Sequence, residues 1–408
     1  MKKLKILIVT QYFWPENFKI NDLAFHLAKL GYDIQVLTGI PNYPTGKYFN
    51  GYGYFKKTNE LIENISIYRV PIIPRGKATR LRLGLNYISF VISATIKALL
   101  IKNKYDLIFI YEPSPITVAI PGIILKKIKQ IPIIIWVTDL WPESVVSAGN
   151  FKSSFIPNLL TPVVRYIYHH CDKILVSSKG FVNSIIDKGI NKSKIEFFPQ
   201  WAELIFKPVR SDKYLLGEIP KNSFKIMFAG NIGEAQDFPS IIETARILKG
   251  NKNIHWVVLG EGRRKEWVNS KVKEYGLESS FHLMGSFPLE MMPKFYAQAD
   301  CLLFSLKKEY IFSITIPGKV QTYLACGKPI VCMVDGEAAK IIDDAKAGLS
   351  CPSESPELLA KNIEQLSSLS EAKLSKLGEN ALLHYKKEFE RNMLMEKMEN
   401  IIINIVNN

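Results

Sequence analysis

The stretch IPIIIWVTDLWPESV, Ile131–Val145, joins an apolar run directly to two acids, Asp139 and Glu143. An apolar run without polar alternation is typical of a strand buried on both faces, as in the parallel sheets of α/β proteins. Ligands of such sheets bind in the crevice outside the carboxyl ends of the strands. The stretch therefore predicts a parallel α/β fold in which the two acids lie at a ligand-binding edge.

Apolar runs alternate with segments of helical period along nearly the whole chain, which has 408 residues, enough for two domains. The first series consists of KILIVT, DIQVLT, DLIFIY, IPIIIWVTD and KILVSS, and a second series extends from KIMFAGN to KPIVCM. Between them, at residues 197–224, the periodicity fails and prolines cluster. We expect two Rossmann-like, doubly wound domains facing a central cleft, at residues 1–205 and 206–385. The helical segment 386–408 is expected to pack back on the first domain.

Composition limits the class of partner. The net charge of +15 and the pI of about 9.3 favour an anionic partner, such as nucleic acid, a membrane surface or a phosphate-bearing ligand. The hydrophobic share of 47% and the charged share of 22% exclude a disordered or fibrous chain. Five cysteines without CxxC or CxxH spacing indicate reduced thiols in a cytosolic protein and no metal site.

Two segments resemble membrane or targeting signals. The apolar run at the amino terminus is short and has no cleavage site, which favours a first strand over a signal peptide. Leu83–Ile101 is long enough to span a bilayer, but it contains Asn86 and Lys97, which favours a buried or surface-lying helix. The neighbouring basic residues suit anionic lipid headgroups, although a core helix with a solvated rim remains open: Arg75, Lys77, Arg80, Arg82, Lys126, Lys127 and Lys129.

The positions of the glycines distinguish a dinucleotide-binding site from other phosphate-binding sites. No GxGxxG follows the first strand, and GYGYF at residues 51–55 precedes no helical segment, which disfavours a dinucleotide-dependent oxidoreductase. In KIMFAGNIGEAQDF, by contrast, Gly230, Asn231 and Gly233 lie between a strand and a helix. Glycines there let backbone N–H groups approach a phosphate, although a tight strand-to-helix turn explains the same pattern.

A second candidate anion site lies in ITIPGKVQTYLACGKPIV, Ile314–Val331. Pro317 and Gly318 precede a short helix that carries Lys319 in its first turn. A lysine at a helix start opposes the helix dipole, which is explained by a bound anion or, alternatively, by a solvated side chain.

These residues carry a family resemblance. PGKVQTYLACGKPI resembles the P-S-K-x-x-E-Y-x-A-x-G-K-P signature of the GT-B glycosyltransferases of family four, a retaining class. The GN-x-G turn, GEG at 260–262, GSF at 285–287 and QAD at 298–300 follow in the order of that family. The amino-terminal loops and DLWPES are similar to a subgroup of bacterial O-antigen and capsule transferases that add N-acetyl-L-fucosamine or a related amino sugar.

The resemblance implies a donor site with substitutions. The basic residues that grip the diphosphate in the family are missing, because their motif falls on Gly230, Asn231 and Gln236. We expect other groups to meet the charge of the diphosphate. These are the amine of Lys319, the backbone amide of Gly233, the backbone amide of Gly318 in the turn at Pro317, and Lys19 of the first domain. Thr322 replaces the ribose-binding glutamate and Ile314 replaces its paired acid, which leaves one uncharged hydroxyl for the ribose. The base is expected near Gly285 and Phe287, with Glu261 and Arg263 close by.

The resemblance also implies roles on the acceptor side. Asp139 aligns with an active-site histidine of many relatives, so it is expected to take the acceptor proton or to stabilise positive charge on the sugar. Capping of the following turn is the alternative for Asp139. Glu143 is expected to orient groups or bind acceptor. No DxD motif ends a strand, which favours a metal-independent reaction. The retaining class, without a nucleophile on the second face of the sugar, implies front-face displacement. The UDP-sugar is expected as co-substrate, with no other cofactor.

The resemblance therefore implies transfer of an amino sugar, N-acetyl-L-fucosamine, from a UDP-sugar to a polyprenyl-diphosphate-linked saccharide. Such a transferase serves O-antigen, capsule or lipopolysaccharide synthesis and is expected at the cytoplasmic face of the plasma membrane, as a peripheral protein without nucleic acid. Two alternatives remain: a UDP-amino-sugar epimerase of the same fold, and a basic nucleic-acid-binding protein. The aromatic tracts QYFWPENF and PNYPTGKYFNGYGYF are expected in loops at strand ends, which suits stacking on sugar better than an RNA-binding sheet face.

Overall fold

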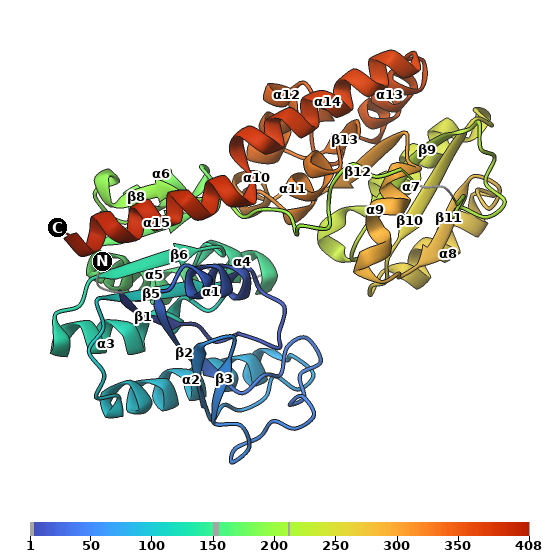
Figure 1. The fold of residues 1–408 in the computed structure, drawn as a ribbon. Coiled ribbons are helices and arrows are strands. Elements are labelled where there is room, and N and C mark those ends of the chain that lie inside the picture. The colour runs from blue at the N-terminus through green and yellow to red at the C-terminus, as the bar shows by residue number, and fades with distance from the viewer. Residues whose placement is uncertain (1–3, 150–154, 211–212, 408) are drawn as a thin grey trace. The chain divides into compact units, whose positions relative to one another are not determined.

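The computed structural model describes residues 4–149, 155–210 and 213–407 (Figure 1). Internal contacts divide the chain into two units. The first contains Met1–Pro199 and Leu394–Asn408, and the second contains Gln200–Met393. The sequence analysis put the corresponding boundaries after residues 205 and 385. Each unit is a Rossmann-like α/β domain, as predicted.

The first unit is built on an eight-stranded sheet with the order β3-β4-β2-β1-β5-β6-β7-β8. All neighbouring strands are parallel except β3 and β4. The apolar runs form the central strands, because both faces of the sheet are covered by helices. The strands are β1 (Lys5–Val9), β2 (Asp33–Gly39), β3 (Asn59–Ile62), β4 (Ile65–Val70), β5 (Leu107–Glu112), β6 (Ile133–Val137), β7 (Lys173–Val176) and β8 (Ile195–Phe197).

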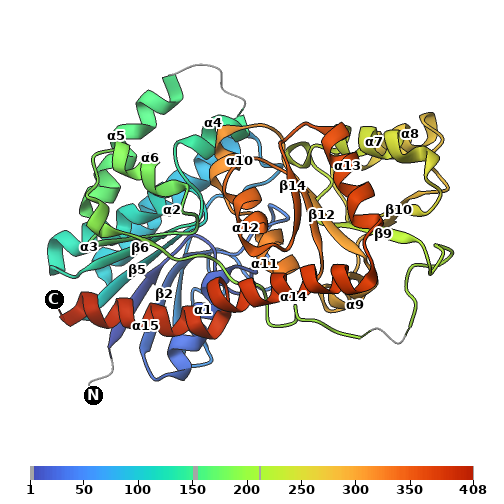
Figure 2. The ribbon, with the colours of Figure 1, turned by 90° about the horizontal axis from the view of Figure 1, so that it is seen from above.

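Helices cover both faces of this sheet (Figure 2). On one face α1 and α15 are joined by an ion pair of 3.7 Å between His26 and Glu399, and Lys397 Nζ donates to the Phe197 carbonyl of β8 at 2.7 Å. On the other face α3 packs against both α2 and α5. The helices are α1 (Lys19–Lys29), α2 (Arg80–Leu100), α3 (Ile120–Lys129), α4 (Glu143–Gly149), α5 (Phe155–His170), α6 (Phe181–Asp187) and α15 (Arg391–Asn407).

The second unit has a six-stranded, fully parallel sheet with the order β11-β10-β9-β12-β13-β14. Its strands are β9 (Phe224–Ala229), β10 (Ile254–Leu259), β11 (Phe281–Gly285), β12 (Cys301–Ser305), β13 (Ile330–Met333) and β14 (Gly348–Cys351). Its helices are α7 (Phe238–Ile247), α8 (Lys265–Glu274), α9 (Met292–Ala297), α10 (Tyr310–Ile314), α11 (Gly318–Ala325), α12 (Glu337–Ala345), α13 (Pro356–Ser367) and α14 (Glu371–Glu388).

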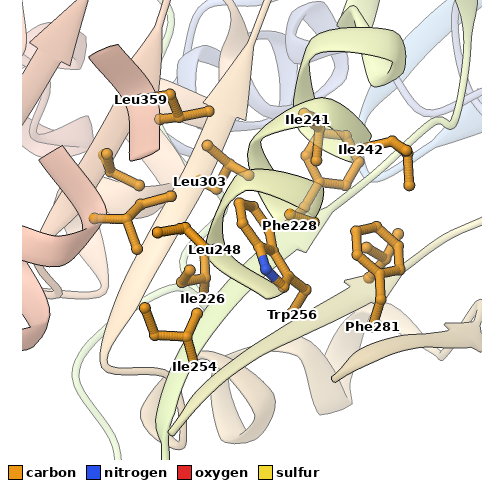
Figure 3. Packing of buried hydrophobic residues seen from close by; sticks show 14 of the residues in the cluster. Ile226, Phe228, Ile241, Ile242, Leu248, Ile254, Trp256, Phe281, Leu303 and Leu359 are labelled. Carbon is orange, nitrogen blue, oxygen red and sulfur yellow. The ribbon is translucent and has the colours of Figure 1, made fainter. Parts of the chain in front are cut away.

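Aromatic packing fixes the strands that carry the candidate site (Figure 3). The ring of Phe228 on β9 meets Phe238 of α7 at a centroid distance of 5.0 Å, and Trp256 on β10 stacks on Phe281 at 6.0 Å. All four side chains are at most 3% exposed. Full burial of each such ring stabilises the fold by about 1.5–3 kcal/mol, so the carboxyl ends of β9 and β10 are held in place.

Two local features differ from expectation. The hairpin β3–β4 was not predicted, although Glu63 and Asn64 between the strands have φ of 45° and 68°, as a two-residue hairpin turn requires. The carboxyl-terminal helical segment is not continuous, because α14 ends at Glu388 and α15 begins at Arg391. Phe389, which lies between the two helices and caps α14, is only 2% exposed.

Candidate functional site

Three glycines at the ends of neighbouring strands expose backbone at the carboxyl edge of the second sheet. Gly230, Gly260 and Gly285 follow or end β9, β10 and β11, with φ of 132°, 149° and 78°, which L side chains rarely adopt. The Gly230 N–H donates to Leu259 O at 2.8 Å, and the Gly260 N–H donates to Gly285 O at 2.7 Å. A Cβ on Gly260 would lie 1.9 Å from Gly230 O, so only glycine permits this close approach.

The turn after Gly230 already has an internal partner. Gln236 Oε1 accepts hydrogen bonds from the Gly233 N–H at 3.2 Å and from Asn231 Nδ2 at 3.5 Å. The structure thus brings together Gly230, Asn231, Gly233 and Gln236, as the sequence analysis expected. The amide of Gly233 is nevertheless occupied by Gln236, so an anion has to displace this side chain to use it.

Lys319 lies beside this turn with a buried amine. Its Nζ is 3.5 Å from the ring centroid of Phe228 and has no hydrogen-bond partner within the described part of the chain. A Cβ on Gly230 would lie 2.8 Å from Lys319 Cε, which places the lysine directly against the glycine turn. Burial lowers the pKa of Lys319 to about 7. A bound anion would favour protonation of this amine, which could then donate charged hydrogen bonds to the anion.

Tyr323 fixes the helix that carries this lysine. Its hydroxyl accepts a hydrogen bond from the Ala229 N–H at 3.1 Å and donates to Leu303 O at 3.3 Å, which ties α11 to β9 and β12. The preceding Thr322 is half-buried, and Ile314 ends α10. Pro317 precedes the first turn of α11, and Gly318 in that turn is exposed, with no heavy atom within 4 Å of a Cβ placed on it.

The loops after β10 and β11 lie close to each other, as predicted. A Cβ on Gly285 would lie 3.5 Å from Glu261 Oε1. Glu261 is exposed and pairs with Lys265 at 2.6 Å, and Arg263 is exposed. The Phe287 ring packs on Phe295 with a centroid distance of 4.4 Å, so only part of its surface remains open to a ligand.

Two cations near the glycine turn were missed by the sequence analysis. Arg264 Nη2 donates to Glu234 Oε2 at 2.8 Å, and Lys307 Nζ lies 3.2 Å from the same oxygen. The Arg264 guanidinium holds the pKa of Glu234 below its usual range, with help from Lys307. Arg264 directly follows Arg263, and the sequence gives no reason to choose between them. Lys307 lies in the loop after β12, where no local sequence pattern indicates a ligand.

In the first unit, Asp139 follows β6 by two residues and occupies a buried polar environment. Its Oδ2 accepts a hydrogen bond from Trp141 Nε1 at 3.3 Å. Burial raises the pKa of Asp139, and hydrogen bonds from Ser144, Ser114 and Trp141 oppose that rise. The side chain of Asp139 thus lies at the edge of the sheet formed by the C-terminal ends of the strands, where the sequence analysis expected it.

Glu112 is a second acid at this edge and was not predicted. It ends β5, is fully buried, and neither carboxyl oxygen has a hydrogen-bond partner within the described residues. Burial, and then the charge of Asp139, raise the pKa of Glu112 well above its usual value. Burial without a compensating charge favours the protonated, neutral form of the acid. The final glutamate of the run DLIFIYE was the available sequence signal.

Glu143 and Lys19 have local positions in the first unit. Glu143 Oε1 accepts from Ser184 Oγ and from Lys188 Nζ, both at 2.6 Å, which joins α4 to α6. This pairing supports an orienting role for Glu143 and leaves its Oε1 unavailable to an acceptor. Lys19 is the half-buried first residue of α1.

The aromatic residues of the first unit's loops pack mainly on one another. Tyr12, Phe18 and Tyr43 form a cluster with centroid distances from 5.1 to 5.8 Å. Arg75 lies over Tyr43 at 5.1 Å, and its Nη1 donates to the Tyr12 hydroxyl at 3.2 Å. Arg75, one of the basic residues that the sequence analysis considered for lipid headgroups, thus contacts this aromatic cluster.

Residues 4–149, 155–210 and 213–407 contain no cluster of metal-ligating side chains. No group of three or more His, Cys, Asp and Glu side chains in these residues is arranged to hold a metal ion. The five cysteines are buried free thiols.

Comparison with known proteins defines the class. The family model for Glycosyltransferase Family 4 matches residues 20–203, and the model for Glycosyl transferases group 1 matches residues 217–384. The first match covers most of the first Rossmann-like unit and ends four residues beyond Pro199, and the second match lies within the second unit. The chain therefore belongs to the GT-B glycosyltransferases and is a glycosyltransferase. Of the three activities left open by the sequence, this assignment supports the transferase.

Individual proteins of similar sequence or fold share about a quarter of the residues of this chain or fewer. The putative colanic acid biosynthesis glycosyl transferase WcaI of Escherichia coli (strain K12) is 26% identical over 344 residues, which cover 79% of this chain and 82% of WcaI. Sucrose-phosphate synthase from Thermosynechococcus elongatus has a similar fold, with a TM-score of 0.74, 16% identity and coverage of 98% and 99%. Anabaena HepE, solved in complex with UDP, has a TM-score of 0.69, 15% identity and coverage of 98% and 100%.

Proposed function

We propose that this glycosyltransferase moves an amino sugar, N-acetyl-L-fucosamine, from a UDP-sugar to a polyprenyl-diphosphate-linked saccharide during synthesis of a bacterial surface polysaccharide. The similarity to a relative named for colanic acid biosynthesis supports the polysaccharide context. The observation that carries the proposal is the buried amine of Lys319, which has no partner among the described residues and lies against the Gly230 turn.

The second unit is the proposed donor site. The amine of Lys319 is proposed to bind the negatively charged diphosphate directly. Arg264 and Lys307 also lie beside the Gly230 turn, where both pair with Glu234. Three cations can supply the charge that a metal ion supplies in other transferases, so we propose a metal-independent reaction. The UDP complex of HepE, a protein of similar fold, supports a uridine nucleotide as the donor carrier. The Thr322 hydroxyl is proposed to bond the ribose, with the base near Gly285.

The first unit is the proposed acceptor site. Asp139 accepts the proton of the acceptor hydroxyl, or stabilises positive charge on the sugar as its bond to the diphosphate breaks. The raised pKa of Asp139 makes the carboxylate a better base than an exposed aspartate. In the proposed retaining reaction the acceptor attacks from the face that the diphosphate leaves. The proton of the acceptor hydroxyl passes to Asp139 if this carboxylate acts as the base, and to the departing diphosphate if Asp139 acts only on the charge of the sugar.

The test uses the purified full chain, a panel of UDP- and GDP-sugars, and a short-chain polyprenyl-diphosphate saccharide. We expect UDP release that requires both a UDP-amino sugar and the acceptor, retention of the donor's anomeric configuration in the product by NMR, and undiminished turnover in EDTA. An isomerised donor without acceptor would instead identify the epimerase. Release of GDP alone would overturn the proposed donor.

A further inference from the structure

Helix α2 turns its most apolar face to solvent. Between Leu85 and Leu100, every exposed residue is leucine or isoleucine. The exposed side chains follow each other mostly at intervals of three and four, so they form one stripe along the helix. We call this set the α2 stripe: Leu81 (74% exposed), Leu85 (38%), Ile88 (59%), Ile92 (57%), Ile96 (55%), Leu99 (53%) and Leu100 (69%).

The opposite face of α2 is packed and fixes the rotation of the helix. It carries Asn86, Phe90, Ala94 and Ala98, all at most 1% exposed. Asn86 Oδ1 accepts from Gln11 Nε2 at 2.6 Å, and Asn86 Nδ2 donates to Ile73 O at 2.5 Å. A rotation that buried the stripe would break these two hydrogen bonds. The helix therefore buries an asparagine and two alanines while it exposes its large aliphatic side chains, which the core-helix alternative does not explain.

Positive charge surrounds the α2 stripe. Residues 75–105 contain seven lysines and arginines and no acid. Lys77 and Arg82 are exposed at the start of α2, and Lys102 and Lys104 are exposed just after its end. On the neighbouring α3, Lys127 is exposed and Ile128 is 60% exposed, so the apolar and basic character continues onto a second helix.

We propose that the α2 stripe lies in the surface of an anionic phospholipid bilayer, with the helix axis in the membrane plane. The helix is long and apolar enough to cross a membrane, and 22% of its most apolar window is buried. Its hydrogen bonds to Gln11 and Ile73 hold it on the sheet, which favours a surface position over a span. An apolar helix face with basic residues around it is the pattern of interfacial membrane helices.

This inference rests on the proposed function, because a lipid-linked acceptor is presented at such a surface. The packed side of α2 also reaches the candidate acceptor site. Tyr87 of α2 meets Trp141 with a ring centroid distance of 6.4 Å, and Trp141 donates to Asp139. The same helix thus contacts the loop that contains Asp139 and presents its stripe on the other side.

The first experiment measures binding of the full chain to vesicles by co-sedimentation. We expect binding to vesicles of phosphatidylcholine with phosphatidylglycerol, and weaker binding to phosphatidylcholine alone or at high salt. The double variant Ile92→Gln/Ile96→Gln should lower the partition coefficient by at least about tenfold for each isoleucine removed. Leu383→Gln is the matched control, because Leu383 is 68% exposed on α14 and should not affect binding. Equal binding of all three proteins would overturn the proposal.

A second experiment locates the stripe without relying on loss of binding. All five native cysteines are buried, so an exposed cysteine introduced by Ile92→Cys can be labelled selectively with an environment-sensitive fluorophore. We expect a blue shift on anionic vesicles and quenching by lipids with brominated acyl chains. The control Leu383→Cys should show neither change. An unquenched label at position 92 in bound protein would overturn the proposal.

Other occupants of the α2 stripe give different results. A dimer in lipid-free buffer that Ile92→Gln/Ile96→Gln dissociates would assign the stripe to a second copy, and resistance of bound protein to alkaline carbonate extraction would indicate a span. Either result overturns the proposal. The proposed function fails separately: sugar transfer to a water-soluble acceptor analogue without vesicle binding rejects only the membrane surface, whereas vesicle binding without transfer from a UDP-amino sugar rejects only the proposed donor and acceptor.

Discussion

The amine of Lys319 lies 3.5 Å from the ring centroid of Phe228, buried and without a hydrogen-bond partner among the described residues. The aromatic face offers a partial interaction for an ammonium group but no acceptor oxygen. Tyr323, one turn further along α11, ties the helix to β9 and β12 and so holds this arrangement. The site therefore keeps a cation donor in place before any anion arrives.

Binding of UDP should consume a proton through Lys319. The pKa of this group is about 7 in the free protein, and a bound diphosphate raises it, so binding above pH 7 protonates the amine. Affinity should fall as pH rises above 7, by up to about tenfold per unit. Calorimetry at pH 8 in buffers of different ionisation enthalpy should report uptake of nearly one proton. Lys319→Met should bind UDP more weakly and show no uptake; uptake that persists in this variant would contradict the assignment.

Gly230→Ala should disturb the same site from the other side. The new Cβ would lie 2.8 Å from Lys319 Cε, and alanine is strained at a φ of 132°. We expect a loss of about 1–3 kcal/mol in the free energy of unfolding, measured in urea, and weaker UDP binding. Gly318→Ala is the control, because a Cβ there has no heavy atom within 4 Å. Equal stability of the two variants would show that the glycine turn is not tightly packed.

Removal of the Glu234 charge should strengthen donor binding. Glu234 pairs with Arg264 and Lys307, and both cations become available to a diphosphate in Glu234→Gln. We expect UDP affinity to rise by about two- to fivefold at low salt and the gain to shrink at high salt. The control Glu274→Gln removes an exposed pair with Lys271 on α8 and should leave affinity unchanged. Weaker binding by Glu234→Gln would mean that Glu234 itself contacts the donor.

Asp139→Asn should remove turnover while UDP binding stays intact. The amide keeps the size of the carboxyl group but cannot accept the acceptor proton, so we expect kcat to fall by at least about 100-fold. In the wild type, activity should be lost as pH falls through the pKa of Asp139, which burial raises above the usual aspartate value. Steady-state rates from pH 4 to 8, with UDP affinity measured in parallel, provide the check. A variant with normal turnover would assign Asp139 to the turn alone.

Glu112→Gln should stabilise the protein at neutral pH. The pKa of Glu112 is raised in the folded state, so folding takes up a proton between the unfolded and the folded pKa values, and stability falls as pH rises through that window. Glutamine is neutral at every pH and avoids this cost. The variant should gain more than about 1 kcal/mol at pH 7 and nothing at pH 4, by urea unfolding at both values. A pH-independent difference would mean that Glu112 is ionised in the folded protein.

Several parts of the candidate site in the second unit were predictable because their signals are local. Gly230, Gly233 and Gln236 occupy one turn after β9, and Pro317, Gly318 and Lys319 occupy another before α11. Backbone conformation restricts such turns to few residue types, so the pattern is visible in the sequence. The pairing of Lys307 with Glu234 joins positions 73 residues apart, and no local signal marks it.

The amino-acid sequence by itself determined the two Rossmann-like units, because unbroken apolar runs become stable only as parallel strands covered by helices on both faces. It also determined where the glycine turns and Lys319 occur along the chain. Tertiary structure alone decided that Glu112 is buried beside Asp139 and that the lysine amine is enclosed. It decided as well that α2 exposes its leucines and isoleucines, since both faces of that helix are apolar in sequence and the hydrogen bonds of Asn86, Ser89 and Ser93 hold the face that packs.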